Sequence, residues 1–408
     1  MDKKQKMVPK LRFPGFTDDW EQRKVTELGE IYIGLVTTMT SHYTDHGALL
    51  IRNSDIKDSR FEFGDNPIYL DDVFAKQNAS RKHKVGDVIT VHTGDIGTSA
   101  VITEKEAGSI GFATIVTRTD RKIITSEYLC AYLNTDTHKN FAMNISTGDG
   151  RNNYNLKDYY ECVVPVPSIA EQMKISSFID GLNNLITLHQ RKLDQMKNYK
   201  QGLLQKLFPK NGKHIPEIRF PGFTDAWEQR KFGELYKKSS EKNDGSIGMD
   251  KNITVATMQF KEDVKVSTED YLRTYYTFNV GDIAFEGHQS KDFRFGRFVE
   301  NDIGNGIVSH IFAVFRPIVD YDLKFWKYAI NNESLMQRVL SRSTKASTMM
   351  HDLVTDDFLE QSFLVPSVEE QNQIGEFLAG IDNLITLHQR KLDQVKEYKK
   401  GLLQQMFV

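Results

Sequence analysis

The segment NLITLHQRKLDQ occurs twice without a change, at Asn184–Gln195 and again at Asn383–Gln394. Chance does not produce an identity of this length within one chain of 408 residues. The match extends upstream to Pro167 and downstream to Phe208 at a constant spacing of 199 residues. About 40 residues therefore form one segment that the chain uses twice.

A second duplicated segment precedes each variable region. Leu11–Lys24 returns as Ile218–Lys231 at a spacing of 207 residues. Each half of the chain therefore consists of a short opening motif, a long variable region and a long repeated segment. This order predicts a tandem duplication with two domains, each large enough to bury its own core.

The composition is that of a soluble globular protein, with 39 % apolar and 26 % charged residues. A net charge of −2 argues against a polybasic protein, although a local basic face can exist within a balanced total. Cys130 and Cys162 lack the number and spacing of a disulfide framework or a metal site, so we expect buried thiols in a reducing compartment. The chain has no N-terminal apolar run and no membrane-spanning stretch, which predicts a cytoplasmic protein without membrane contact.

The opening motif contains the turn Phe13-Pro14-Gly15-Phe16, and Trp20 follows at a distance from which it could fold back onto the two phenylalanines. Its copy contains Phe220 and Trp227. These aromatic residues could form a patch that binds a partner, or a packing clip at the start of each half. The clip is the favoured interpretation.

The variable regions show short apolar runs separated by turn residues, which predicts a mixed α/β fold. Apart from a shared Val-Gly-Asp and a few apolar positions, the two regions differ, so we expect one scaffold with two different surfaces. In the first region we expect strands at 48–51, 85–91 and 111–116 and a helix at 126–134. In the second we expect strands at 253–260, 280–285 and 307–315 and a helix at 323–340.

Each repeated segment begins with Pro-Ser-x-x-Glu, in which Ser168 and Glu171 have the spacing of a capping box. The residues that follow place apolar side chains at alternating steps of three and four, which predicts a long amphipathic helix. Such a helix needs a partner, and the second copy provides one. The spacing alone allows a parallel or an antiparallel pair. Glycines within the segments permit kinks or close approaches at 181, 202, 380 and 401.

The sequence contains no G-x-x-x-x-G-K-[ST], no G-x-G-x-x-G after a strand and no H-E-x-x-H, and it has no Asn-Pro-Pro-aromatic motif of an amino-methyltransferase. We therefore expect no catalysis, metal site or bound cofactor in this chain.

Basic and amide side chains instead gather between the expected strands and helices. Arginine and lysine can bind phosphates or guanine, and amides can bind adenine. Any one of these residues is more readily explained as a solvated loop side chain, but the clusters as a whole favour a nucleic-acid ligand. In the first region the candidates are Arg81, Lys82, Lys84, His92, Thr93, Arg151, Asn152 and Asn153. In the second region they are His288, Gln289, Lys291, Arg294, Arg297, Arg342 and Lys345.

Together these features resemble the specificity subunit of type I restriction-modification systems over essentially the whole chain. The resemblance rests on Pro-Ser-x-x-Glu-Gln at Pro167 and Pro366, Gly-Leu-Leu-Gln at Gly202 and Gly401, and the Val-Gly-Asp motifs. The opening Arg-Phe-Pro-Gly-Phe is also similar to that family.

The resemblance implies two target-recognition domains, at residues 1–166 and 210–365. It also implies that the repeated helices, at residues 167–209 and 366–408, form an antiparallel coiled coil. Each domain would read one half of a split double-stranded DNA target, with an unread spacer between the halves. Because the two variable regions differ in their residues, we expect an asymmetric target. Two copies of a modification subunit with S-adenosylmethionine, and a restriction subunit that uses ATP and Mg²⁺ to translocate DNA, would carry the chemistry.

Two alternatives compete with this interpretation. A self-contained nuclease or methyltransferase would act on DNA without partners. A scaffold that bridges two proteins through its paired helices would touch no DNA, but it would not explain why the variable regions diverge while the repeated segments hardly change.

Overall fold

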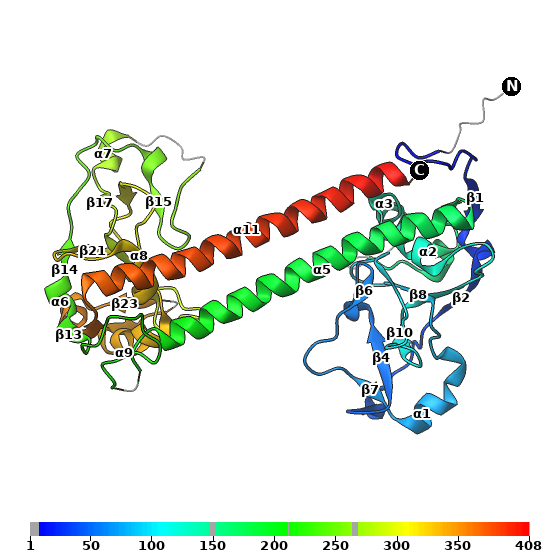
Figure 1. The fold of residues 1–408 in the computed structure, drawn as a ribbon, viewed down its shortest axis with the longest axis horizontal. Helices are drawn as coiled ribbons and strands as arrows, with labels where there is room; N and C mark the ends of the chain where they lie inside the picture. The colour runs from blue at the N-terminus through cyan, green and yellow to red at the C-terminus, as the bar shows by residue number, and fades with distance from the viewer. Residues whose placement is uncertain (1–7, 147–151, 211, 263–267, 349, 408) are drawn as a thin grey trace. The chain divides into compact units, whose positions relative to one another are not determined.

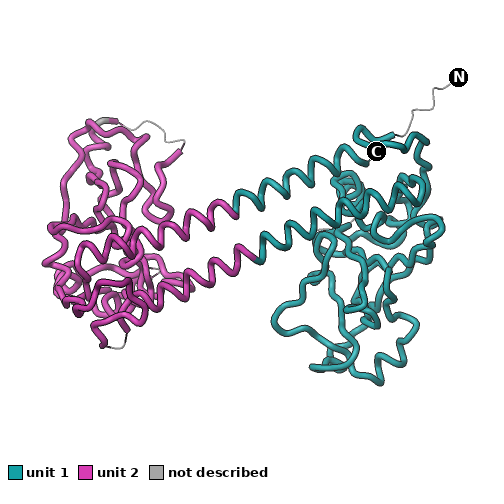
Figure 2. The backbone as a smooth tube through the Cα atoms, viewed as in Figure 1, with its two compact units in different colours: residues 1–191, 389–408 teal, residues 192–388 magenta. Residues whose placement is uncertain are grey.

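The computed structural model describes residues 8–146, 152–210, 212–262, 268–348 and 350–407. The chain forms two compact units: unit 1 contains residues 1–191 and 389–408, and unit 2 contains residues 192–388 (Figure 2). Each unit therefore combines one variable region with parts of both repeated segments.

Unit 1 is built on two four-stranded sheets (Figure 1). The first has the order β2-β11-β8-β9 and is antiparallel throughout, and the second has the order β10-β4-β7-β3 with β10 and β4 parallel. Its strands are β1 (Glu21–Lys24), β2 (Gly29–Ile33), β3 (Tyr43–Thr44), β4 (Ala48–Arg52), β5 (Ile56–Lys57), β6 (Arg60–Phe61), β7 (Tyr69–Leu70), β8 (Asp87–Thr90), β9 (Ser99–Val101), β10 (Ile110–Phe112), β11 (Ile115–Thr119) and β12 (Val163–Val166). Its helices are α1 (Asp72–Gln77), α2 (Ser126–Leu133), α3 (Asp136–Ile145), α4 (Leu156–Tyr159) and the first part of α5 (Ile169–Lys206), with 3-10 turns η1 (Val25–Glu27), η2 (Thr40–His42), η3 (Asn53–Asp55) and η4 (Ala79–Arg81).

Unit 2 repeats this scaffold, because its four-stranded sheet has the equivalent order β14-β21-β18-β19. Its strands are β13 (Glu228–Lys231), β14 (Tyr236–Ser239), β15 (Ile253–Thr254), β16 (Gln259–Phe260), β17 (Tyr276–Phe278), β18 (Ile283–Glu286), β19 (Arg297–Glu300), β20 (Gly306–Val308), β21 (Ala313–Pro317), β22 (Thr344–Ala346), β23 (His351–Leu353) and β24 (Ser362–Val365). Its helices are α6 (Phe232–Leu235), α7 (Glu269–Leu272), α8 (Leu323–Ile330), α9 (Glu333–Ser343), α10 (Thr355–Glu360) and the first part of α11 (Val368–Met406), with the 3-10 turn η5 (Met249–Lys251).

The mixed α/β architecture is confirmed, but four expected elements are divided. The expected strand at 307–315 is two strands, β20 and β21, which lie in different sheets. Ala113 adopts a φ of +47°, so the expected strand at 111–116 is two strands, β10 and β11, in different sheets. The expected strand at 253–260 is the hairpin β15-β16. The expected helix at 323–340 is α8 and α9, because Asn332 caps a new helix by accepting a hydrogen bond from the Ser334 amide.

The shared Val-Gly-Asp motif has a structural role in both units. Gly86 and Gly281 take φ values of +89° and +88°, which favour glycine. The buried Asp87 at the start of β8 binds Arg118 of β11 at 2.8 Å. In unit 2 the buried Asp282 binds Arg316 of β21 at 3.1 Å. The motif therefore turns the chain into a central strand and ties that strand to its neighbour.

The opening motif is a packing clip, as its favoured interpretation predicted. Arg12 pairs with the buried Glu171 at the start of α5, and Phe13 packs edge-to-face on Phe178 at 5.8 Å. Trp20 is also buried, in the core cluster against which Phe13 packs. The ring partners of Trp20 in the described part of unit 1 are Tyr128 of α2 and Phe407, just after α11.

The capping box predicted at the start of the first long helix is confirmed for the hydrogen bond to Ser168. The Glu171 amide donates to Ser168 Oγ at 3.4 Å. The Glu171 carboxylate, however, accepts hydrogen bonds from Arg12 and from Trp20 Nε1. Its main role is therefore to join the long helix to the opening motif.

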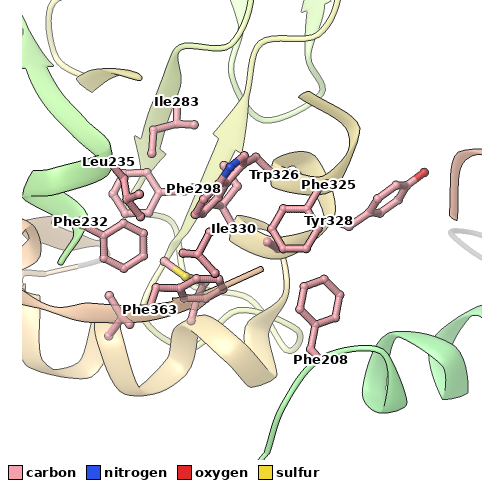
Figure 3. Packing of buried hydrophobic residues seen from close by; sticks show 14 of the residues in the cluster. Phe208, Phe232, Leu235, Ile283, Phe298, Phe325, Trp326, Tyr328, Ile330 and Phe363 are labelled. Carbon is pink, nitrogen blue, oxygen red and sulfur yellow. The ribbon is translucent and has the colours of Figure 1, made fainter. Parts of the chain in front are cut away.

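The long helices run antiparallel, as two separate cores show. In unit 1, Ile179 near the start of α5 shares a core with Leu403 near the end of α11. In unit 2, Leu203 near the end of α5 shares a core with Ile374 near the start of α11. The start of each helix thus packs with the end of the other. Phe208, just after α5, continues the unit 2 core against Phe325 of α8 at 5.5 Å (Figure 3).

The helical glycines at 181, 202, 380 and 401 lie inside α5 and α11, which continue through them. A Cβ added at any of these four positions would meet no atom within 4 Å. The close approaches that glycine could permit are therefore not seen here. No helix within the described ranges has the length and apolar character needed to cross a membrane.

Candidate nucleic-acid interface

In unit 1 the structure brings together two of the predicted clusters. The chain leaves β8 into the loop 91–98, and Thr93 forms an isolated β-bridge with Asn153, which precedes α4. The Tyr154 amide donates to the His92 carbonyl at 2.9 Å. His92, Thr93, Asn152 and Asn153 therefore belong to one surface, although about 60 residues separate the two loops. Arg151 lies outside the described residues.

The side chains of this surface form a hydrogen-bonded chain. The Thr93 hydroxyl donates to Asn153 Oδ1 at 2.8 Å and lies 2.7 Å from His92 Nδ1. Partial burial lowers the pKa of His92, so its imidazole is neutral at physiological pH. Asn152, which precedes Asn153, is exposed. Neutral hydrogen-bonding groups of this kind are suited to reading base edges.

Asn53, which was not among the candidates predicted from the sequence, supports this surface through two hydrogen bonds. Its Oδ1 accepts from the His92 amide at 2.8 Å, and its Nδ2 donates to the Ala113 carbonyl at 3.1 Å. Asn53 thereby joins the end of β4 to the loop after β8. No local pattern marks this residue, because its partners are 39 and 60 positions away.

In unit 2 the equivalent loop follows β18 and is held in the same way. His288 forms an isolated β-bridge with Met350, and the His351 amide donates to the Gly287 carbonyl at 2.8 Å. A side chain at Gly287 would meet the His351 carbonyl at 2.1 Å, so the close approach requires glycine. Both units therefore dock the loop after this central strand onto the segment before the last short helix.

This arrangement gathers most of the predicted side chains of unit 2. Lys345 lies on the β22-β23 hairpin opposite Asp352, and Arg342 ends α9 just before that hairpin. The exposed candidates along the two docked segments are His288, Gln289, Lys291, Arg294, Arg342 and Lys345. Exposed cationic side chains of this kind are chemically suited to binding phosphates.

Arg297 has a different environment from these exposed residues. It lies at the start of β19, where Nε binds Glu286 at 3.0 Å and Nη2 donates to the Ala256 carbonyl at 2.6 Å. Its guanidinium also lies 4.9 Å from the centre of the Phe293 ring. These contacts indicate that Arg297 supports the loop in this conformation.

The remaining candidates of unit 1 lie at the other end of β8. Lys84 precedes β8 while His92 follows it, so the structure does not bring the two clusters together. Arg81 donates to the Ile33 carbonyl at 3.0 Å and lies over the Tyr32 ring, and Lys82 forms an isolated bridge with Ile110. Lys84 is exposed, although its amide is bound by Asp87.

The described residues contain no group of three or more His, Cys, Asp or Glu side chains arranged to hold a metal ion. Cys130 and Cys162 are buried free thiols, and burial raises the pKa of Cys162 to about 12. A thiol with so high a pKa is a poor nucleophile.

The chain contains one scaffold twice, and the two copies carry different polar loops at the same place. This arrangement is that of a binding protein with two recognition units. Comparison with known proteins identifies that class. Residues 17–198 and 224–397 match the type I restriction modification DNA specificity domain, and the chain belongs to this family. It is a type I restriction-modification specificity subunit, the component that recognises the DNA target.

Similar proteins agree with this family. The type I restriction enzyme MjaVIII specificity subunit of Methanocaldococcus jannaschii is 24 % identical over 69 % of each chain. The putative type I restriction enzyme MjaX specificity subunit of the same organism is 20 % identical over 98 % of this chain and 95 % of its own. The crystal structure of the type I restriction-modification system S subunit from M. genitalium has the same fold, with a TM-score of 0.60, 12 % identity, and coverage of 98 % of this chain and 99 % of its own.

Proposed function

We propose that each unit of this chain reads one half of a bipartite DNA target, and that partner subunits then methylate adenine in the target or restrict DNA that lacks the methylation. The observation that carries the proposal is the duplicated docking of the loop after the central strand, Thr93 on Asn153 in unit 1 and His288 on Met350 in unit 2. A duplicated scaffold with different side chains at the same place is what two half-sites of different sequence require.

The exposed residues support DNA as the ligand. Unit 2 offers four cations on or beside its docked segments, Lys291, Arg294, Arg342 and Lys345, together with the amide of Gln289. Unit 1 offers neutral imidazole, hydroxyl and amide groups. Cations bind the phosphate backbone, and amides and histidine read base edges in the major groove. Because the two sets differ, the target is asymmetric rather than palindromic.

The repeated helices supply a surface for the catalytic partners. Leucines at identical repeat positions remain exposed in both units, Leu185 and Leu188 in unit 1 and Leu384 and Leu387 in unit 2. Neighbouring apolar side chains left exposed on one surface can mark an interface with a second protein, and here they recur in both copies of the helix. Two equal surfaces would bind two copies of a modification subunit that carries S-adenosylmethionine. A restriction subunit with ATP and Mg²⁺ would join the larger complex.

The helices would also set the distance between the half-sites. Each long helix begins in one unit and ends in the other, so its length is the natural measure of the unread spacer.

Co-expression of this chain with its modification subunit, followed by single-molecule sequencing of the host DNA, tests the proposal. We expect methylated adenines in one split, asymmetric motif, and only when both subunits are present. Either subunit expressed alone is the control. If the assembled complex leaves adenine methylation unchanged, the proposal is wrong and the bridging of two proteins becomes the better function.

A further inference from the structure

The hydrogen-bonded chain His92–Thr93–Asn153 has a defined direction. A threonine hydroxyl carries one proton, and that of Thr93 is donated to Asn153 Oδ1. The contact of 2.7 Å between Thr93 Oγ1 and His92 Nδ1 must then use a proton on the imidazole. His92 is therefore the tautomer with its proton on Nδ1.

This tautomer fixes what the surface presents to a ligand. A neutral imidazole protonated on Nδ1 has a lone pair on Nε2, so His92 offers an acceptor there. Asn153 uses its oxygen within the chain, so its Nδ2 group offers donors. Among the hydrogen bonds within the described residues, none engages His92 Nε2 or Asn153 Nδ2. Both side chains are partly exposed.

The surrounding contacts hold this pair in place before any ligand arrives. Asn53 accepts from the His92 amide, and the Tyr154 amide donates to the His92 carbonyl. The Tyr154 ring is fully buried, and its hydroxyl lies 3.2 Å from Nε2 of the buried His138. The acceptor and the donor therefore sit on a preorganised support, which lowers the entropy cost of binding.

We propose that His92 and Asn153 read one adenine of the half-site bound by unit 1, through its major-groove edge. His92 Nε2 accepts from the N6 amino group, and Asn153 Nδ2 donates to N7. Thr93 is a positioning residue that fixes the tautomer. The proposal rests on the proposed function, because it assumes that unit 1 binds DNA.

The pattern discriminates against the other three bases. Guanine places its O6 acceptor where adenine has its amino group, so two lone pairs would face each other at His92. Thymine presents an acceptor and a methyl group there. Cytosine can donate from N4 but has no N7 for Asn153.

Substitution of Thr93 tests the tautomer directly. In the complex with the modification subunit, Thr93→Val removes the hydroxyl and keeps the shape, so the imidazole can carry its proton on either nitrogen. Adenine methylation should then map to a motif in which one adenine of one half-site is relaxed toward guanine, with discrimination reduced roughly tenfold or more. The other half-site should be unchanged, and Thr93→Ser should restore the original motif.

Base analogues provide a second measurement on the unaltered complex. Duplexes carry purine, which lacks the amino group, or 7-deazaadenine, which lacks N7, at each adenine in turn. Both analogues should weaken binding at one and the same adenine. Asn153→Ala should abolish the sensitivity to 7-deazaadenine, and it should also reduce the sensitivity to purine, because the Thr93 proton is then no longer committed to Asn153 Oδ1.

Two results would overturn the inference. One is a Thr93→Val motif that is unchanged or relaxed equally in both half-sites, and the other is an unaltered complex that tolerates both analogues at every adenine. If Thr93→Val fails to fold, the analogues alone decide. Failure of the proposed function looks different, because the unaltered complex would then methylate no specific motif.

Discussion

Arg12 donates two hydrogen bonds to the carboxylate of the buried Glu171, at 2.7 and 2.8 Å. Arg219 and Glu370 repeat the pair in unit 2 at the same distances. The tryptophans differ, since Trp20 Nε1 donates to Glu171 at 3.2 Å, whereas Trp227 Nε1 is buried without a hydrogen-bond partner among the described residues. Both copies of the packing clip therefore have the ion pair, whereas the hydrogen bond from tryptophan is found in the first copy and not in the second.

This difference predicts unequal costs for the same substitution. Glu171→Gln leaves Arg12 without its counter-charge and weakens the bond from Trp20, so we expect a loss of about 3 kcal/mol in the free energy of unfolding of unit 1. Glu370→Gln should cost unit 2 about 1 kcal/mol less than that, because its tryptophan contributes no bond. Urea unfolding of both variants gives the comparison. Equal losses would show that the tryptophan bond contributes nothing.

A second prediction concerns pH. Burial lowers the pKa of His138 to about 4, below the 6.5 of an unfolded histidine. The unfolded state therefore binds more protons at acid pH, so the contribution of neutral His138 to stability is complete above pH 6.5 and is lost as the pH falls toward 4. The effect is on the order of 2 kcal/mol or more at pH 4. Thermal unfolding of unit 1 from pH 7.5 to 4.5 should show this decline, and His138→Gln should reduce its slope. An unchanged slope in the variant would contradict the assignment.

A third prediction concerns the exposed leucines. Leu188 is 62 % and Leu387 is 47 % exposed, so a glutamate at either position should leave the fold intact. If these residues bind the modification subunit, Leu188→Glu or Leu387→Glu should leave one bound copy, and the double variant should leave none. Native mass spectrometry counts the copies. Gln195→Glu and Gln394→Glu add the same charge at exposed duplicated positions and serve as controls. Two bound copies in the double variant would place the interface elsewhere.

A fourth prediction concerns helix length. Seven residues inserted in each long helix, between Arg191 and Lys192 and between His388 and Gln389, keep the apolar face in register. They add roughly 10 Å to each helix, which corresponds to about 3 base pairs of duplex. Methylation mapping should find both half-sites unchanged and the spacer longer. The same seven residues inserted after Lys213, between the two halves, should leave the spacer as it was.

Much of this fold was predictable, because duplication and periodicity are properties of the sequence itself. The repeated helices, the shared scaffold and the start of each helix at Ser168 and Ser367 follow from spacing. The division of the expected elements does not follow from spacing. The elements at 111–116 and 323–340 are divided by a single backbone conformation at Ala113 and a single helix cap at Asn332. The hydrophobic periodicity of a segment carries no signal for the conformation of one residue or for one helix cap.

The candidate interface was only partly predictable for a related reason. Residue chemistry selected the loops at His92 and Asn153 separately, but their contact depends on the sheet order. The same chemistry selected Arg81, although its guanidinium is occupied by the Ile33 carbonyl and the Tyr32 ring. Asn53 was missed because an asparagine that holds a backbone amide has no distinguishing neighbours in the sequence.

The assignment of one half-site to each unit can be tested with a single chimera. Both variable regions begin after the same four residues, Glu21–Lys24 and Glu228–Lys231, and both end before Pro-Ser. The junctions are also equivalent in structure, since Gln172 accepts from the Thr125 amide and Gln371 accepts from the Asp322 amide. Residues 25–166 can therefore replace residues 232–365, which gives a chain with two copies of the first region.

The decisive measurement is the adenine methylation motif of this chimera, assembled with the modification subunit and compared with the motif of the natural chain. If each unit reads one half-site, the chimera will methylate a palindromic split motif made of two copies of the first half-site, and the second half-site will disappear. A chimera that assembles and still methylates the original asymmetric motif would contradict the central claim.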